Sequence, residues 1–199
     1  MTQLDISLAV STYQAGKVVF LSPVDENTLI QLPRNFTFAM ALGIRGNKMA
    51  VAARDEVVIL GNDPSLAQNY PGQPGTYDSF YVPRTTYHCG RLNIHGFHWD
   101  KNGLLAVNTQ FSCLSYIDEE YSFKPVWKPP FISELAPEDR CHLNGMAVRN
   151  GRAEYVTTLG HTDKAGGWRD TRPYGGLLIN VETSEIVLEK LAMPHTPKF

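Results

Sequence analysis

The chain has 199 residues, 43% of them hydrophobic, which is long enough for one full hydrophobic core or two small ones. Its formal net charge is −2 and no block of like charges occurs, so neither nucleic-acid binding nor a polybasic membrane surface is expected. Polar residues interrupt the N-terminal region before an export signal or membrane span could form, which predicts a soluble, cytoplasmic protein. Three cysteines without C-x-x-C spacing, Cys89, Cys113 and Cys141, indicate reduced thiols rather than disulfides or a zinc ribbon.

Short runs rich in β-branched and aliphatic residues fill the chain between frequent glycines and prolines. In chain order, strands are expected over residues 6–12, 17–23, 27–33, 48–54, 56–61, 104–109, 153–160, 176–181 and 185–191. The best helical candidate, residues 131–140, is short and contains Pro137. The sequence therefore predicts an all-β protein.

Three segments share one pattern: a lead residue, a small residue, about four further residues to a turn, and then an apolar strand. They begin at Met40, His95 and Asn144, and "HTPKF" repeats the start of the pattern with His195 as its lead. The spacing is close to 50 residues, and a period of this length with several strands in each repeat is typical of β-propeller blades.

The blade count predicts an incomplete ring. Residues 5–36 resemble the outer strands of a blade without its inner strand, whereas "HTPKF" resembles an inner strand without outer ones. Residues 1–199 then form a single propeller domain of about four blades, or the N-terminal part of a larger propeller whose last blade is cut. As an open arc the chain would expose sheet edges and self-associate.

In a propeller, the loops that enter the inner strands meet at one mouth of the central channel. The lead residues His95, Asn144 and His195 are therefore expected there with Met40, and His142 lies two residues before Asn144. Imidazoles and a carboxamide could bind a divalent transition metal, with His95, His142 and His195 as ligands, or could orient a polar ligand. Alternatively, these side chains hydrogen-bond to neighbouring backbone and fasten the blades together. Gly96 and Gly145 would let the inner strands approach closely.

Two loops supply further candidates. Arg84 and His88 precede the His95 strand in "RTTYHCG" and could reach the same mouth, although loop polarity explains them equally well. Trp168 and Arg169 lie in a glycine-rich insertion of about 15 residues, a length typical of lids and binding loops. Cysteine catalysis is not favoured, because no orienting partner can be identified.

The segments "HLNGMAVRNG" and "GGLLINVETSEIV" resemble inner-strand motifs of gluconolactonase- and strictosidine-synthase-like propellers. End to end, the chain resembles an uncharacterised bacterial family of propeller-like proteins, some of them fused to tetratricopeptide repeats. This resemblance implies further blades after "MPHTP" and carries no established activity. Met40 stands where the lactonase pattern has a glutamate, which argues against a calcium-dependent lactonase mechanism.

Two functions remain open. The first is a module that binds a small polar ligand or a protein partner at the channel mouth. The second is a metal-dependent hydrolase or isomerase of the lactonase-like propeller type. The missing glutamate favours the first, and the convergence of polar side chains on the channel favours the second.

Overall fold

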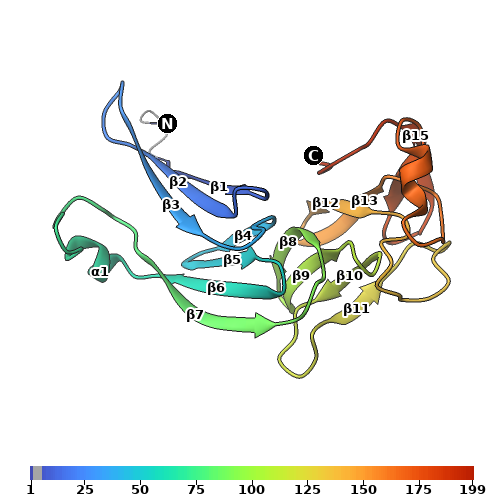
Figure 1. The fold of residues 1–199 in the computed structure, drawn as a ribbon, viewed down its shortest axis with the longest axis horizontal. Coiled ribbons are helices and arrows are strands. Elements are labelled where there is room, and N and C mark those ends of the chain that lie inside the picture. Colours follow the sequence, from blue (N-terminus) through green and yellow to red (C-terminus); the bar gives the residue numbers. More distant parts are fainter. Residues whose placement is uncertain (2–5) are drawn as a thin grey trace.

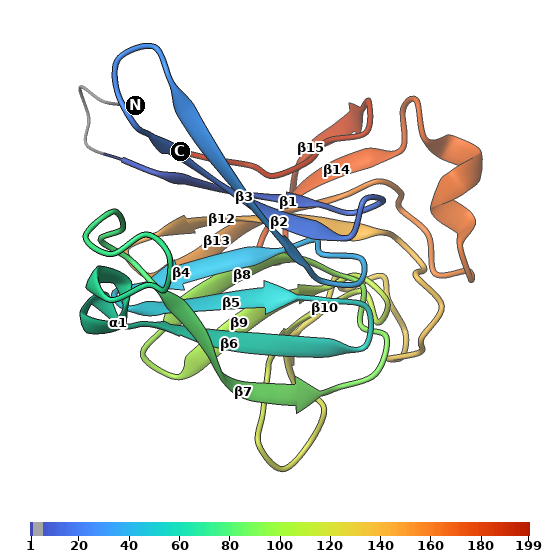
Figure 2. The same ribbon diagram turned by 60° about the vertical axis from the view of Figure 1, so that its left-hand side comes forward.

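A computed structural model describes residue 1 and residues 6–199 (Figure 1). The described residues form four antiparallel sheets arranged in a ring like propeller blades, with only short helical segments. The predicted all-β propeller fold is therefore confirmed. In the turned view, successive sheets lie side by side along the chain (Figure 2).

The first two sheets contain residues 8–88. Sheet one is β1 (Leu8–Thr12), β2 (Lys17–Pro23) and β3 (Leu29–Asn35), and sheet two is β4 (Leu42–Arg45), β5 (Lys48–Ala52), β6 (Glu56–Asn62) and β7 (Tyr81–His88). A short helix, α1 (Pro64–Gln68), lies in the connection between β6 and β7. Sheet one has three strands, where the other sheets have four.

The last two sheets contain residues 94–191. Sheet three is β8 (Ile94–Asp100), β9 (Gly103–Asn108), β10 (Cys113–Tyr116) and β11 (Lys124–Trp127), and sheet four is β12 (Leu143–Arg149), β13 (Arg152–Thr158), β14 (Gly176–Asn180) and β15 (Ile186–Leu191). A 3-10 helix, η2 (Gly167–Thr171), lies between β13 and β14. Within each sheet the strands follow one another in sequence order, from an inner to an outer strand.

The hydrophobic core is divided into three clusters, one at each boundary between neighbouring sheets. Strand β9 shows how the sequence builds two clusters at once. Leu104 and Ala106 pack toward sheet two, whereas Leu105 and Val107 pack toward sheet four. Because successive side chains point to opposite faces of a strand, a run that is apolar throughout is buried on both faces. This explains why the inner strands read as continuous apolar runs.

Every repeat turns into its inner strand through a left-handed residue. Two positions before each lead residue stands a residue with positive φ: Phe38 (55°), Asn93 (52°), His142 (52°) and Met193 (44°). Such values are uncommon outside glycine. The same backbone bend at the same position supports the repeat alignment deduced from the sequence.

Glycines in the inner strands allow close approach between backbones. A Cβ on Gly145 would lie 2.7 Å from the Thr196 nitrogen, as the sequence predicted for that position. A Cβ on Gly96 would meet only a Val107 methyl group, at 3.3 Å. The tightest contact between two sheets is at Gly43, where a Cβ would lie 2.7 Å from the Phe97 Cβ.

We expect Gly43→Ala to lower the free energy of unfolding by about 1–3 kcal/mol, because β4 and β8 must move apart. Gly96→Ala is the matched control and should have a smaller effect, since a rotating methyl group is its nearest neighbour. Urea unfolding of the three proteins measures both. Equal destabilisation by the two substitutions would contradict the close packing of β4 on β8.

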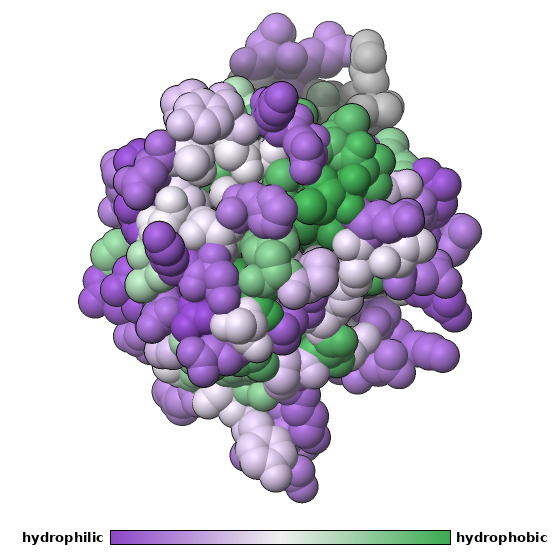
Figure 3. All heavy atoms as spheres, turned by 90° about the vertical axis from the view of Figure 1, so that its right-hand side faces the viewer, coloured by the Kyte–Doolittle hydropathy of each residue, from purple (hydrophilic) through white to green (hydrophobic). Residues whose placement is uncertain are grey.

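The predicted helix over residues 131–140 is absent from the structure, and the helical segments within residues 6–199 are α1 and η2 instead. Residues 131–140 form turns, held by Arg140, whose guanidinium pairs with Glu134, Glu138 and Asp163. No helix in the described part of the chain has the length and apolar character needed to cross a bilayer. On the C-terminal side, the surface is mostly hydrophilic, with one large hydrophobic area and several smaller ones (Figure 3).

Candidate functional site

Two of the predicted histidines meet at the start of the inner strands. The rings of His95 and His142 lie edge to face, with centroids 4.9 Å apart. His95 Nδ1 is 2.9 Å from the Asn93 carbonyl oxygen and 2.7 Å from Thr109 Oγ1. The Thr109 hydroxyl donates to the Leu143 carbonyl, so it accepts from His95 and links sheet three to sheet four.

Asp139 organises the other side of His142. Its carboxylate accepts from His142 Nδ1 at 3.0 Å and from Trp168 Nε1 at 3.1 Å, and Arg169 Nη2 lies 3.7 Å away. The His142 and Trp168 rings are 4.2 Å apart, and the Arg169 guanidinium lies 4.5 Å from the Trp168 ring centre. The insertion that contains Trp168 and Arg169 therefore packs against the mouth.

Asn144 and His195 lie where the C-terminal segment passes the last sheet. Asn144 is 2% exposed; it accepts from the Thr157 hydroxyl and donates to the Pro194 carbonyl. These contacts match the alternative in which the lead residue fastens blades together. His195 is exposed, and its Nδ1 is 2.8 Å from the Met193 carbonyl.

The three histidines share one tautomer. A carbonyl or a carboxylate can only accept, so each Nδ1 that faces one carries a proton, and in the neutral ring Nε2 then has the lone pair. Among the described residues, none of the three Nε2 atoms has a hydrogen-bond partner. His95, His142 and His195 can thus accept hydrogen bonds from a ligand.

Burial keeps His95 neutral. The pKa of His95 is lowered to about 4, chiefly by removal from water and to a smaller extent by the neighbouring His142 and His195, while the Asn93 carbonyl and Asp139 oppose the shift. The ring is therefore an uncharged acceptor at physiological pH.

A metal at these histidines gains no support from their arrangement. Within residue 1 and residues 6–199, no group of three His, Cys, Asp or Glu side chains is placed to hold a metal ion. The protonated Nδ1 and free Nε2 are nevertheless the form that metal-binding histidines take. The transition-metal site remains a sequence prediction.

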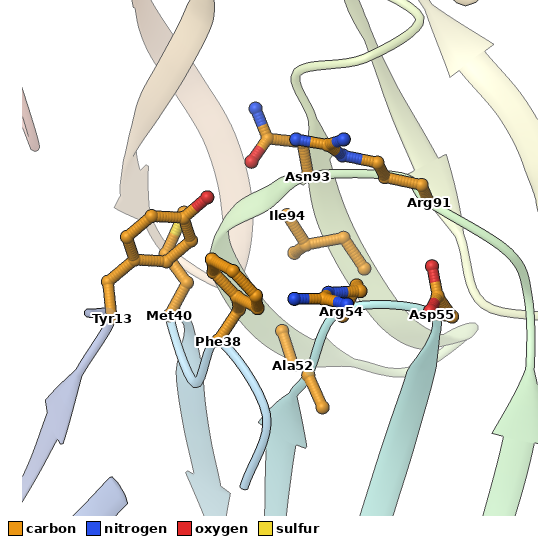
Figure 4. A pocket seen from close by; sticks show the side chains of 10 residues that line it. Tyr13, Phe38, Met40, Ala52, Arg54, Asp55, Arg91, Asn93 and Ile94 are labelled. Atoms are coloured by element: carbon orange, nitrogen blue, oxygen red, sulfur yellow. The ribbon is translucent and has the colours of Figure 1, made fainter. Parts of the chain in front are cut away.

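A cavity of about 390 Å³ has Asn93 and Ile94, the two residues before His95, in its lining (Figure 4). It is lined by Tyr13, Phe38, Met40, Ala52, Ala53, Arg54, Asp55, Arg91, Asn93 and Ile94, which come from the first three sheets and their connections. Asn93 links the two features, because its side chain lines the cavity while its carbonyl holds His95. Met40 lines the cavity as the apolar lead residue, in the position expected from the sequence.

Two guanidinium groups give the cavity its charge. Arg54 lies across the Phe38 ring at 4.0 Å from its centre, and the Tyr13 ring packs edge-on against Phe38 at 4.9 Å. The Arg91 side chain lies beside Asn93, and both stand above Arg54 in the view of Figure 4. Among the described residues, Asp55 is the one carboxylate in the lining, so these residues give the cavity two cations, one anion and an apolar floor.

The structure does not bring Arg84 and His88 to the mouth. Both belong to β7, the outermost strand of sheet two, and neither lines the cavity. The His88 side chain is 83% exposed and lies 3.8 Å from Glu56. The connection to His95 begins only after β7 ends at His88.

The three cysteines are free and buried, as expected for reduced thiols. Burial raises the pKa of Cys89 to about 11 and those of Cys113 and Cys141 to about 12. Thiols of this kind stay protonated and are poor nucleophiles.

Sequence reasoning missed five polar residues of the mouth: Asn93, Thr109, Asp139, Arg54 and Arg91. Some had a readable signal. Arg91 and Asn93 stand four and two residues before the lead residue His95, and Asp139 stands three residues before His142. Arg54 and Thr109 each follow the second strand of a repeat, a connection that returns to the same end of the blade.

The fold and this site define a β-propeller domain with a polar channel mouth. The model of the family described as Domain of unknown function (DUF4915) matches residues 1–199, so the chain belongs to this family. No match was found among the curated proteins.

Proposed function

We propose that the channel mouth binds a small hydroxylated carboxylate, which makes the domain a ligand-binding module. The observation that carries the proposal is the cavity with Arg54 and Arg91 in its lining, together with Asn93, whose carbonyl pairs with the His95 ring. Guanidinium groups complement a carboxylate. Neutral imidazoles accept from hydroxyl groups.

The size and lining of the cavity support a small ligand over a protein partner. About 390 Å³ lies within the range of small-molecule pockets, and charged and polar side chains stand over an apolar floor of Met40, Ala52 and Ile94. Gluconate combines one carboxylate with several hydroxyl groups and is a suitable probe.

Isothermal titration with gluconate tests the proposal. We expect saturable binding at one site, weakened at least tenfold by Arg91→Ala, because a hydrogen bond to a charged group contributes about 1.5–3 kcal/mol. Arg84→Ala is the matched control, since this arginine lies on the outer strand; it should change affinity less than twofold. Absence of binding, or equal affinity in the two variants, would contradict the proposal.

The Asp139–His142 pair favours a second candidate function, acid–base catalysis by a hydrolase or isomerase. The carboxylate holds the imidazole in the tautomer in which Nε2 can act as a base. Hydrolysis of δ-gluconolactone, followed with and without added zinc, separates the two functions. A binding module leaves the spontaneous rate unchanged, whereas an acceleration that His142→Gln removes would identify an enzyme.

A further inference from the structure

A second cavity, of about 480 Å³, lies between the first two sheets. It is reached from the opposite ends of the strands that border the mouth. The residue after the end of β1, Tyr13, lines the mouth, whereas Leu8, at its start, lines the second cavity. In the same way, Met40, which precedes β4, lines the mouth, whereas Ile44, near the end of β4, lines the second cavity. The two cavities are separate sites.

The connection between β6 and β7 builds one wall of this second cavity. The connection is fixed at both ends, because Phe80 nitrogen donates to Asn62 Oδ1 and Phe80 oxygen accepts from Asp63 nitrogen, both at 2.8 Å. Asp63 also caps α1, and Gln68 donates to the Tyr77 carbonyl. In the turned view this connection and α1 lie at one end of the molecule, and the segment around residue 168 lies at the other (Figure 2).

Aromatic rings from two sheets surround the cavity. Phe20 of β2 and Tyr81 of β7 stack at 6.0 Å with an interplanar angle of 18°. Tyr70 contacts both Tyr77 and Phe80, with ring centres 5.5 and 5.6 Å away. All five rings line the cavity. Ring faces and edges of this kind pair with another flat aromatic ring in stacked or edge-on geometry.

Polar groups stand at the edge of the same cavity. Arg34 and Asp78 are exposed residues of opposite charge in its lining, and Ser22 contributes a hydroxyl group. The Arg34 guanidinium uses one donor on the Pro33 carbonyl, which leaves others for a ligand. A single hydroxyl substituent would find both an acceptor and donors here, and opposite charges at the edge do not favour a charged ligand.

We infer that this second cavity is a binding site for a flat, uncharged aromatic molecule that carries a hydroxyl group at one edge, the chemistry of a phenol. The rings of Phe20, Tyr81 and Tyr77 would contact its faces and edges, and Asp78 or Arg34 would pair with the hydroxyl group. The site is independent of the ligand proposed for the channel mouth.

Isothermal titration with 2-naphthol tests this inference. We expect saturable binding at one site, weakened at least tenfold by Ser22→Trp, which places an indole in the cavity, and by Tyr77→Ala, which removes one wall. Val24→Ala is the control, because Val24 is 63% exposed and does not line the cavity. Decahydro-2-naphthol has the same hydroxyl group on puckered rings and should bind at least fivefold more weakly.

The inference would be overturned by no saturable binding of 2-naphthol, by full affinity in the Ser22→Trp variant, or by equal affinity for the saturated alcohol. Arg91→Ala should leave 2-naphthol binding unchanged. Loss of binding in that variant would place the probe at the channel mouth and would equally overturn the second site. Failure of gluconate binding has no bearing on this result.

Discussion

Acidification from neutral pH to about pH 4 is expected to destabilise the protein by up to about 3 kcal/mol through His95 alone. Burial lowers the pKa of His95 to about 4 in the folded protein, whereas a histidine of the unfolded chain has its ordinary pKa of 6.5. Between pH 6.5 and about pH 4, this histidine is protonated in the unfolded chain but stays neutral in the folded protein. The stabilisation is therefore complete above pH 6.5 and is lost as the pH falls through the folded pKa.

Urea unfolding of the wild type and His95→Gln between pH 7.5 and 4 measures this contribution. The difference in stability between the two proteins should shrink as the pH falls, because glutamine does not titrate. His88→Gln serves as the control, since its side chain is 83% exposed. Parallel pH profiles for wild type and His95→Gln would contradict the burial of a neutral His95.

Asp139→Ala is expected to have the largest effect of any single change at the mouth. The carboxylate accepts from His142 and Trp168, so its removal leaves two donors unpaired. Leaving a buried donor without an acceptor lowers the stability by about 1–3 kcal/mol, and here two donors lose their acceptor. Alanine would also have to adopt the positive φ of 49° at this position, which adds to the cost.

Thermal and urea unfolding compare Asp139→Ala with Asp170→Ala, which removes an exposed carboxylate from η2, the segment that contains Trp168. The control should stay within about 0.5 kcal/mol of the wild type, as surface substitutions usually do. Trp168 fluorescence should shift to longer wavelength only in Asp139→Ala, because its indole loses a partner and becomes solvated. Equal stability of both variants would show that Asp139 does not hold the loop.

The fold could be predicted from the sequence because repetition and alternation are both local signals. Runs such as Leu104–Val107 are apolar at every position, which fits a strand buried on two faces, and the interval of about 50 residues gave the blade. The start of each inner strand also recurs in the backbone, as the positive φ of Asn93 and Met193 shows. Repeated geometry made the lead residues predictable.

The site was less predictable because loops do not repeat. Arg84 and His88 stand close before His95 in sequence, yet the strand hydrogen bonds of β7 to β6 keep them at the outer edge of sheet two. Arg54 lies in the connection between β5 and β6 of sheet two. It lines the cavity although it follows the lead residue Met40 by 14 positions in the sequence. Distance along the chain was a poor guide to which side chains share the mouth.

Asn144 illustrates a different limit. Its position as a lead residue was correctly identified, but its role depends on a partner 50 residues later, the Pro194 carbonyl. A carboxamide that is 2% exposed and already hydrogen-bonded to Thr157 and Pro194 is withheld from a ligand by its burial. The structure therefore separates Asn144, which is held by contacts within the protein, from His95 and His195, whose Nε2 atoms can accept a hydrogen bond from a ligand.

The most direct test of ligand binding at the mouth is a crystal structure of the protein soaked or co-crystallised with gluconate. The account predicts the carboxylate between the Arg54 and Arg91 guanidinium groups and the hydroxyl groups toward the Nε2 atoms of His95 and His142. An empty cavity at saturating gluconate, or gluconate bound away from both arginines, would contradict it.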